Sequence, residues 1–174
     1  NILTHVDDSM FLNLQMFALI EYYSNDKSFV VPQSVRAIGT WSFNGAPIIS
    51  IIMKGYVETI EDCAFIGCHL LEDVVLPTSL KEIANDAFSK CISLKQIHIP
   101  EGVTKLGYRV FEKCKSLRVV SLPKTICHIG SYAFDECENL QAIIVPYGSV
   151  ANFKIILNNC IYSNYKYKKL LVAQ

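Results

Sequence analysis

The chain has 174 residues, of which 51% are hydrophobic and 18% charged, and its sixteen basic and sixteen acidic residues cancel. Phosphate binding leaves a basic excess, so this balance, with both signs spread along the chain, argues against nucleic acid as the main partner. The longest apolar stretch, Pro47 to Met53, is broken by Ser50 and is far shorter than the ~20 residues of a membrane span. The chain begins at Asn1 without Met or a signal peptide, which suggests a processed or trimmed product.

Residues 1–31 predict an irregular repeat with an insertion. Leu3, Val6 and Phe11 have spacings that recur later in the chain, but Phe11 lies 32 residues before Phe43. A constant period therefore requires roughly nine extra residues within 22–29. That inserted loop carries two tyrosines, so it is a candidate contact site, unless it packs back on the end of the molecule.

Residues 32–145 predict five regular repeats. Three kinds of residue recur at a step of 23, apart from one deletion after Phe43, and they form columns of phenylalanine, cysteine and proline. The columns are Phe65, Phe88, Phe111 and Phe134; Cys68, Cys91, Cys114, Cys137 and Cys160; and Pro77, Pro100, Pro123 and Pro146. A fixed period of this length indicates one supersecondary unit copied along an axis, each copy burying its apolar side against the next.

Each repeat predicts a strand, a second short strand and a tight turn. The stretch Leu94 to Ile99 ends in period-2 alternation before Pro100, which is typical of a strand. The pair Val103 and Leu106 brackets a shorter extended segment, and the spacing from Phe88 to Cys91 to Leu94 favours one helical or 3₁₀ turn. Because equivalent strands stack in parallel, each coil should advance by ~4.8 Å, and six coils should make a rod about 30 Å long.

The cysteine column has three interpretations. Thiols ~4.8 Å apart on successive coils are within reach of a disulfide, but a free buried cysteine also behaves as a small hydrophobic residue. A zinc site is a poorer fit, since a straight column does not converge on a tetrahedron and the sequence has no C-x-x-C pair. Cys63 and Cys127 lie outside the column, which favours buried core thiols over paired ones.

Period-2 geometry also predicts a candidate partner-binding face. Side chains two apart on the first strand of each repeat point away from the core, so they stack into two outward columns. The two columns are Ser50, Asp73, Gln96, Val119 and Ala142, and Ile52, Val75, His98, Ser121 and Ile144. Apolar contacts among hydrogen-bonding groups suit a modest protein interface, although outward β-branched residues also simply stiffen a sheet.

Residues 146–174 predict a C-terminal cap. An open solenoid exposes a strand edge and a slice of core, and the amphipathic stretch from Val150 to Leu157, followed by Leu170 to Val172, can cover them. A second interpretation is a basic aromatic patch for an acidic partner. It would consist of Tyr162, Tyr165, Lys166, Tyr167, Lys168 and Lys169.

The repeat written in Pro123 to Val145, P-x-x-I-x-x-I-G-x-x-A-F-x-x-C-x-x-L-x-x-I-x-V, resembles the BspA-type leucine-rich repeat. The resemblance implies a single domain over residues 1–174, a right-handed β-solenoid of about six coils. It also implies a cell-surface or secreted interaction module, often adhesive, with a protein or glycan partner and without catalytic residues, metal or cofactor. A scaffolding segment of a longer repeat protein is the alternative, and we expect a monomer or weak oligomer.

The four histidines agree with a non-enzymatic function. His5, His69, His98 and His128 fall at different repeat positions, and no two are spaced as metal ligands or as a base with its orienting group. The sequence has no G-x-S-x-G, no P-loop and no H-E-x-x-H motif. We therefore expect no enzyme activity.

Overall fold

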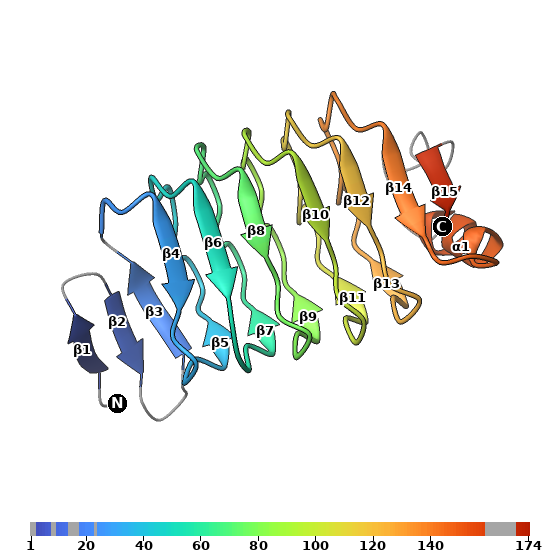
Figure 1. The fold of residues 1–174 in the computed structure, drawn as a ribbon. Coiled ribbons are helices and arrows are strands. Elements are labelled where there is room, and N and C mark those ends of the chain that lie inside the picture. The colour runs from blue at the N-terminus through green and yellow to red at the C-terminus, as the bar shows by residue number, and fades with distance from the viewer. Residues whose placement is uncertain (1–2, 8–9, 14–17, 23, 159–169) are drawn as a thin grey trace.

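A computed structural model describes residues 3–7, 10–13, 18–22, 24–158 and 170–174. The chain winds into a solenoid whose successive coils lie side by side (Figure 1). Each coil contributes one longer and one shorter strand, and equivalent strands of neighbouring coils pair in parallel. The exception is β8 (Asp73–Val75) and β10 (Gln96–His98), which lie side by side but belong to separate sheets. The chain makes about five turns, one fewer than the six coils expected from the sequence, and the solenoid class itself is as predicted.

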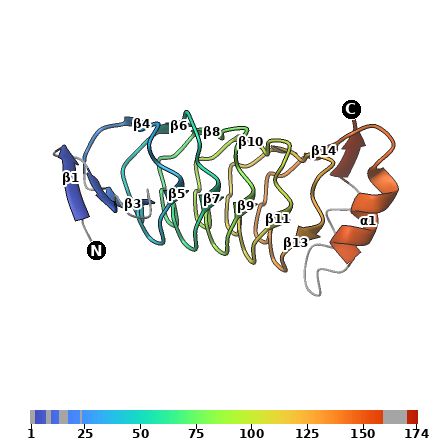
Figure 2. The same cartoon turned by 90° about the horizontal axis from the view of Figure 1, so that it is seen from below.

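The strands form two series on different sides of the solenoid (Figure 2). The long-strand series is β4 (Ser28–Val31), β6 (Ser50–Met53), β8 (Asp73–Val75), β10 (Gln96–His98), β12 (Val119–Ser121), β14 (Ala142–Val145) and β15 (Leu171–Ala173). The short-strand series is β5 (Ala37–Ile38), β7 (Thr59–Ile60), β9 (Glu82–Ile83), β11 (Lys105–Leu106) and β13 (His128–Ile129). In both series the partner residues are those that the sequence period predicts, such as Gln96 with Val119 and Lys105 with His128.

The phenylalanine column forms a continuous stack in the core. Ring centroids are 4.8 Å apart between Phe43 and Phe65, 5.0 Å between Phe65 and Phe88, 5.7 Å between Phe88 and Phe111, and 5.9 Å between Phe111 and Phe134. All five rings are fully buried. Aliphatic side chains from the two strand series fill the remaining interior, so each coil adds one slice to a single core.

The tight turn of each coil consists of β-turns. In one coil the N–H groups of Ala64, Ile66 and Cys68 donate to the carbonyl oxygens three residues earlier. Two residues of this turn, Cys63 (φ 57°) and Gly67 (φ 71°), have a left-handed backbone conformation. The equivalent two residues are left-handed in every regular coil. In a helix, the backbone N–H groups would donate to carbonyl oxygens of the same helix. Here the N–H groups of Cys63, Phe65 and Gly67 instead donate to the next coil, at 2.9, 2.8 and 2.9 Å.

The first coil begins at a different place from the one that the spacing of Leu3, Val6 and Phe11 predicts. Residues before it form antiparallel strands: β1 (Leu3–Asp7) pairs with β2 (Met10–Asn13), and β2 pairs with β3 (Ala18–Tyr22). Strand β3 then pairs in parallel with β5, so that Leu19 lies beside Ile38. Leu19 is fully buried. Leu19 therefore occupies the buried short-strand position that the sequence analysis assigns to Val6.

The predicted insertion is also wrong. From Leu19 to Ile38 there are 19 positions, four fewer than the period, so the first coil is short rather than long. Tyr22 does not loop out: its ring stacks on Phe43 at 4.8 Å, and its hydroxyl donates to the Asp26 carbonyl at 3.2 Å. Burying an aromatic ring at the exposed end of the stack is more favourable than leaving it in water.

The C-terminal end carries the helix α1 (Val150–Asn158) and strand β15 (Figure 2). Phe153 and Leu157 of the helix are buried, and β15 pairs in parallel with β14. The basic aromatic patch predicted between Tyr162 and Lys169 lies outside the described residues. Within the described part of the chain, no helix has the length and apolar character needed to cross a membrane.

Candidate binding surface

The ten predicted face residues lie on one outward face, which we call the long-strand face. Parallel pairing places Asp73 beside Ser50 and Val75 beside Ile52, and the remaining six are arranged in the same way on β10, β12 and β14. Each of the ten is exposed or half-buried, whereas the residue between them on each strand points inward. The inward residues Ile51, Ile97 and Val120 are buried.

The structure extends this face at both ends. Ser28 and Val30 of β4 lie beside Ser50 and Ile52, and Val172 of β15 lies beside Ile144. The sequence analysis missed these positions. A 22-residue step from Ser28 to Ser50 was available as a signal, but β15 follows the non-repeating helix α1, so no period could have identified it.

One outward column of the long-strand face has exposed valines on both sides of a polar segment. Val30 and Val75 are each 53% exposed, and Val172 at the other end is 47% exposed. Between them lie the exposed side chains of Gln96 and His98. Of the ten predicted residues, Asp73 is the one acid and His98 the one base, so the face carries little charge.

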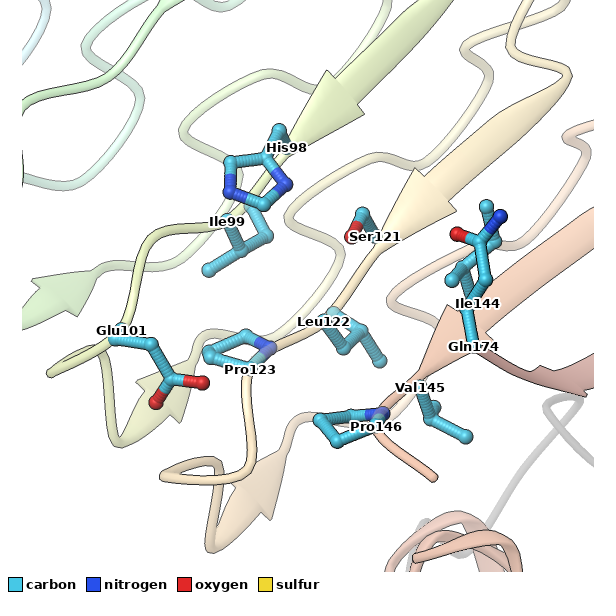
Figure 3. Close-up of a pocket in the computed structure, with 10 residues that line it drawn as sticks. All are labelled: His98, Ile99, Glu101, Ser121, Leu122, Pro123, Ile144, Val145, Pro146 and Gln174. Atoms are coloured by element: carbon cyan, nitrogen blue, oxygen red, sulfur yellow. The ribbon is translucent and has the colours of Figure 1, made fainter.

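Two open grooves run along the middle of this face. The larger has a volume of about 420 Å³ and is lined by Asp73, Gln96, His98, Val119 and Gln174, among others. The second, of about 320 Å³, lies at the carboxyl ends of the strands, where Pro123 and Pro146 are among the residues that line it (Figure 3). His98, Ser121, Ile144 and Gln174 border both grooves, so the two grooves adjoin across β10, β12, β14 and β15.

Ser121, His98 and Glu101 share the second groove but do not form a catalytic triad (Figure 3). A triad requires hydrogen bonds from nucleophile to base and from base to acid. No hydrogen bond joins these three side chains, all of which the structure describes; Glu101 instead accepts the backbone N–H of Lys124 at 3.4 Å. The groove therefore has the residue types of a triad without its geometry.

The cysteine column is a set of buried thiols bonded to the phenylalanine column. The Sγ atoms of Cys68, Cys91, Cys114 and Cys137 donate to backbone carbonyl oxygens of Phe43, Phe65, Phe88 and Phe111 at 2.9, 3.2, 3.1 and 3.0 Å. Each thiol thus ties its coil to the phenylalanine of the coil before. Burial raises the pKa of Cys91 and Cys114 well above the ordinary thiol value, which keeps both protonated.

This arrangement favours the core-thiol interpretation over disulfides. Cys63, Cys68, Cys91, Cys114 and Cys127 are free thiols, and Cys160 lies outside the described residues.

Three carboxylates, Glu112, Asp135 and Glu136, have oxygens within 4.8 Å of one another. Protein groups already hold two of them: Ser89 donates to Glu112 at 3.3 Å, and Lys113 pairs with Glu136 at 3.4 Å.

A family model for the BspA type leucine rich repeat region matches residues 16–141 and 58–172, with six copies. The chain belongs to the BspA-type leucine-rich repeat family. The start of that match at residue 16 agrees with the position of β3 as the first short strand of the solenoid. No curated protein matches this BspA-type chain.

Solved bacterial repeat proteins share the fold. A leucine-rich repeat protein of T. pallidum is 32% identical with a TM-score of 0.72, over 76% of this chain and 66% of that one. A leucine rich cell surface protein of Faecalibacterium prausnitzii is 29% identical with a TM-score of 0.71, over 80% of this chain and 37% of that one. The pneumococcal vaccine antigen PcpA, 18% identical over 95% of this chain and 46% of its own, has the same fold with a TM-score of 0.70. This BspA-type chain therefore spans only part of these relatives.

Proposed function

We propose that the chain is a non-catalytic protein-interaction module whose long-strand face holds the partner. The observation that carries this proposal is the in-register stacking of the strands, which gathers ten side chains spread over residues 50–144 into one surface. A rigid face of this kind loses little conformational freedom when a partner binds, because its side chains are already ordered by the sheet.

The chemistry of the face favours a protein partner over a glycan. Pyranose rings pack their C–H faces on aromatic side chains, and the ten residues of the two columns include no aromatic residue. Exposed Val75, close to Gln96 and His98 in the larger groove, combines apolar contact with hydrogen bonding, as protein interfaces do. The two adjoining grooves across β10, β12, β14 and β15 are the region we expect a partner segment to occupy.

A cell-surface or secreted setting, with adhesion as the activity, is the second part of the proposal. The similarity to the cell surface protein of F. prausnitzii supports it. The cysteines do not oppose it, because buried thiols with a raised pKa form little thiolate and so resist oxidation. A ladder of reduced cysteines is thus compatible with an oxidising environment.

The test compares two matched double variants for binding to immobilised extracellular-matrix proteins and to a glycan array. One variant, Val75→Glu/His98→Glu, alters the long-strand face; the other, His69→Glu/Leu70→Glu, makes the same changes at exposed residues of a loop. We expect the face variant to lose at least tenfold in affinity for any matrix protein bound, and the loop variant to bind normally. Equal binding by both variants, or binding to glycans alone, contradicts the proposal.

The second candidate function is a scaffold within a longer repeat protein. The chain covers only 37% of the F. prausnitzii protein and 46% of PcpA, so an equivalent longer protein would have room for a binding region elsewhere. In that case the solenoid would act as a spacer. The face variant would then leave adhesion of the longer protein unchanged, while shortening the solenoid by one 23-residue repeat would change its reach.

A further inference from the structure

The long-strand series is interrupted at one place in the middle of the solenoid. Strands β4, β6 and β8 form one sheet and β10, β12, β14 and β15 form another, although β8 and β10 lie side by side (Figure 1). The short-strand series continues through the same point, since β9 pairs in parallel with both β7 and β11. We call the boundary between β8 and β10 the seam, and the coils on its two sides the N-terminal and C-terminal units.

A backbone hydrogen bond that recurs at the amino ends of the long strands is missing at the seam. In the C-terminal unit the N–H of Arg118 donates to the Lys95 carbonyl at 2.8 Å, and the N–H of Gln141 donates to the Arg118 carbonyl at 2.9 Å. The equivalent bond across the seam would join the N–H of Lys95 to the Glu72 carbonyl. Within the described residues, which include both, no such bond occurs.

The carboxyl ends of the long strands show the same difference. The N–H of Ile99 donates to the Ser121 carbonyl at 2.9 Å, which ties β10 to β12. Leu76 holds the equivalent position after β8, and the structure, which describes both residues, has no bond from its N–H to the His98 carbonyl. A closed seam would restore this bond and so would gain a backbone hydrogen bond that the neighbouring coils already have.

The apolar core is also less well covered at the seam. The inward residues Ile97 and Val120 of the next two long strands are buried, whereas Val74 on β8 is half-buried. Leu76 is half-buried as well, although Ile99 at the equivalent position is fully buried. The larger groove of the long-strand face reaches into this opening, because Val74 and Ile97 are among the residues that line it.

Side chains join the long strands at the seam where other coils use the backbone. Lys95 Nζ lies 2.5 Å from a Glu72 carboxylate oxygen, and the Ser93 hydroxyl donates to the His69 carbonyl at 2.6 Å. The lysine and glutamate side chains are 61% and 40% exposed. An exposed ion pair contributes little stability, so these contacts can break and form again at low cost.

The same two coils are held firmly on the side of the turns. The N–H of Phe65 donates to the Ala87 carbonyl at 2.8 Å, and the N–H of Gly67 donates to the Ser89 carbonyl at 2.9 Å. The rings of Phe65 and Phe88 stack with centroids 5.0 Å apart. The two units therefore stay joined along the short strands and turns, and only the long-strand side is free to move.

We propose that the seam is a hinge at which the long-strand face opens and closes. The two units move as rigid bodies about the short strands and turns, and each unit keeps its own part of the face rigid. The structure holds the hinge open. In the closed position the N–H of Leu76 donates to the His98 carbonyl, and Val74 becomes buried like the other inward residues.

The hinge changes the width of the larger groove. Asp73 and Val75 line this groove from one side of the seam, and Gln96 and His98 line it from the other. A partner segment that fits only the open groove would hold the hinge open, because a ligand shifts an equilibrium toward the state it binds better. This consequence rests on the function proposed above, whereas the hinge itself requires no partner.

Two single substitutions test the hinge with a zinc clamp. Val75→His places an imidazole opposite His98 across the seam, and Ser121→His places one opposite His98 within the paired strands β10 and β12. Zn²⁺ binds each imidazole nitrogen at ~2 Å and so draws the two side chains together. Bound zinc should therefore close the seam in the first variant and leave the backbone of the second, the matched control, unchanged.

Hydrogen exchange of the Leu76 amide, followed by NMR in the full 174-residue chain, measures closure. Saturating Zn²⁺ should slow this exchange at least tenfold in Val75→His, because closure supplies the His98 carbonyl as an acceptor, and should alter it less than twofold in Ser121→His. The Ile99 amide, which is already bonded, is the internal reference. If calorimetry shows zinc binding to the control alone, or to Val75→His without slower exchange at Leu76, the seam cannot close and the proposal is overturned.

Distances between spin labels measure the motion without zinc. Labels on Val30→Cys and Val172→Cys lie on β4 and β15, six strand spacings or about 29 Å apart, on opposite sides of the seam. Labels on Gln96→Cys and Val172→Cys lie within the C-terminal unit and form the reference pair. We expect the pair across the seam to show a distance distribution at least one and a half times as wide as that of the reference pair. The background has serine in place of three cysteines, Cys63, Cys127 and Cys160.

Two outcomes separate the hinge from the partner-binding function. Equal widths for the two label pairs overturn the hinge, whatever the zinc result. Neither experiment contains a partner, so the failure of the hinge leaves the proposed function standing, and a long-strand face that binds nothing leaves the hinge standing.

Discussion

The phenylalanine stack and the outward column of the long-strand face obey the same 23-residue period but differ in composition. The inner column repeats one residue in five coils, and all five rings are fully buried. The outer column changes at almost every coil: Val30, Ile52, Val75, His98, Ser121, Ile144 and Val172. A buried position has the same neighbours in every coil, so close packing selects the same side chain each time. An outward position has water on one side, which leaves its residue free to serve a partner.

Removing one ring from the stack should produce the largest loss of stability. Phe111 is fully buried between Phe88 and Phe134, with ring centroids at 5.7 and 5.9 Å. Phe111→Ala should lower the free energy of unfolding by ~3–5 kcal/mol, because the cavity cannot close between two fixed rings. Urea denaturation measures it, with outward Val119→Ala as the control, expected to cost less than about 1 kcal/mol. Similar losses for both would contradict the distinction between inner and outer columns.

Adding one methyl group between coils should have the next largest effect. A Cβ on Gly107 would lie 2.4 Å from the carbonyl carbon of Ala84, so the two backbones touch at this point. Gly107→Ala should cost ~1–3 kcal/mol through overpacking. Thr104→Ala, an exposed change in the same coil, should be nearly neutral. A neutral Gly107→Ala in thermal melts would mean that the coils can move apart at little cost.

The buried thiols predict a loss of stability in alkaline solution. The pKa of Cys91 and Cys114 is raised in the folded protein above the ordinary 9.0, so the unfolded chain releases these protons first. Their contribution is complete below pH 9 and falls as the pH rises above it, by about 1.4 kcal/mol for each thiol at pH 10. The free energy of unfolding of Cys91→Ala/Cys114→Ala should therefore depend less on pH between 8 and 10 than that of the wild type. Parallel pH curves for the two proteins would exclude this account.

A surface ion pair should contribute least. Lys95 and Glu72 lie 2.5 Å apart, but their side chains are 61% and 40% exposed. Lys95→Ala should change the free energy of unfolding by less than about 1 kcal/mol, because solvent and salt screen an exposed pair. Chemical denaturation at low and high salt would measure this change in the free energy of unfolding. A loss as large as that of a core substitution would mean that outer charges, too, hold the coils together.

The inner columns could be predicted from the sequence because their physical cause is local and repeated. Phe88 and Cys91 recur at the same step in the next coil, where Val120 takes the place of Ile97, and parallel stacking brings equivalent positions together whatever the details of the coil. The same reasoning placed the ten residues of the long-strand face correctly on their strands. That this face binds a partner remains a prediction, because no repeat pattern encodes what lies on the solvent side.

The start of the first coil and the left-handed turns could not be predicted, because their causes leave no regular spacing in the sequence. Leu3, Val6 and Phe11 match the repeat by chance, while the buried position belongs to Leu19, which only the pairing of β3 with β5 reveals. The left-handed turn residues share no side-chain type. Their conformation follows from backbone N–H groups that bond the next coil, which residues as different as Cys63, Asp86 and Arg109 can all provide.

The stacking of coils also determines how the molecule would respond to a pulling force. Each coil is held to the next by backbone hydrogen bonds between residues 22 or 23 positions apart, and it contacts only its immediate neighbours. Tension applied to the two termini would therefore peel the solenoid from an end, one coil at a time. Each rupture would release one repeat, or about 80 Å of extended chain. A tether of this design would lengthen in uniform steps and keep its remaining coils folded, yielding gradually where a domain of the same size would break open at once.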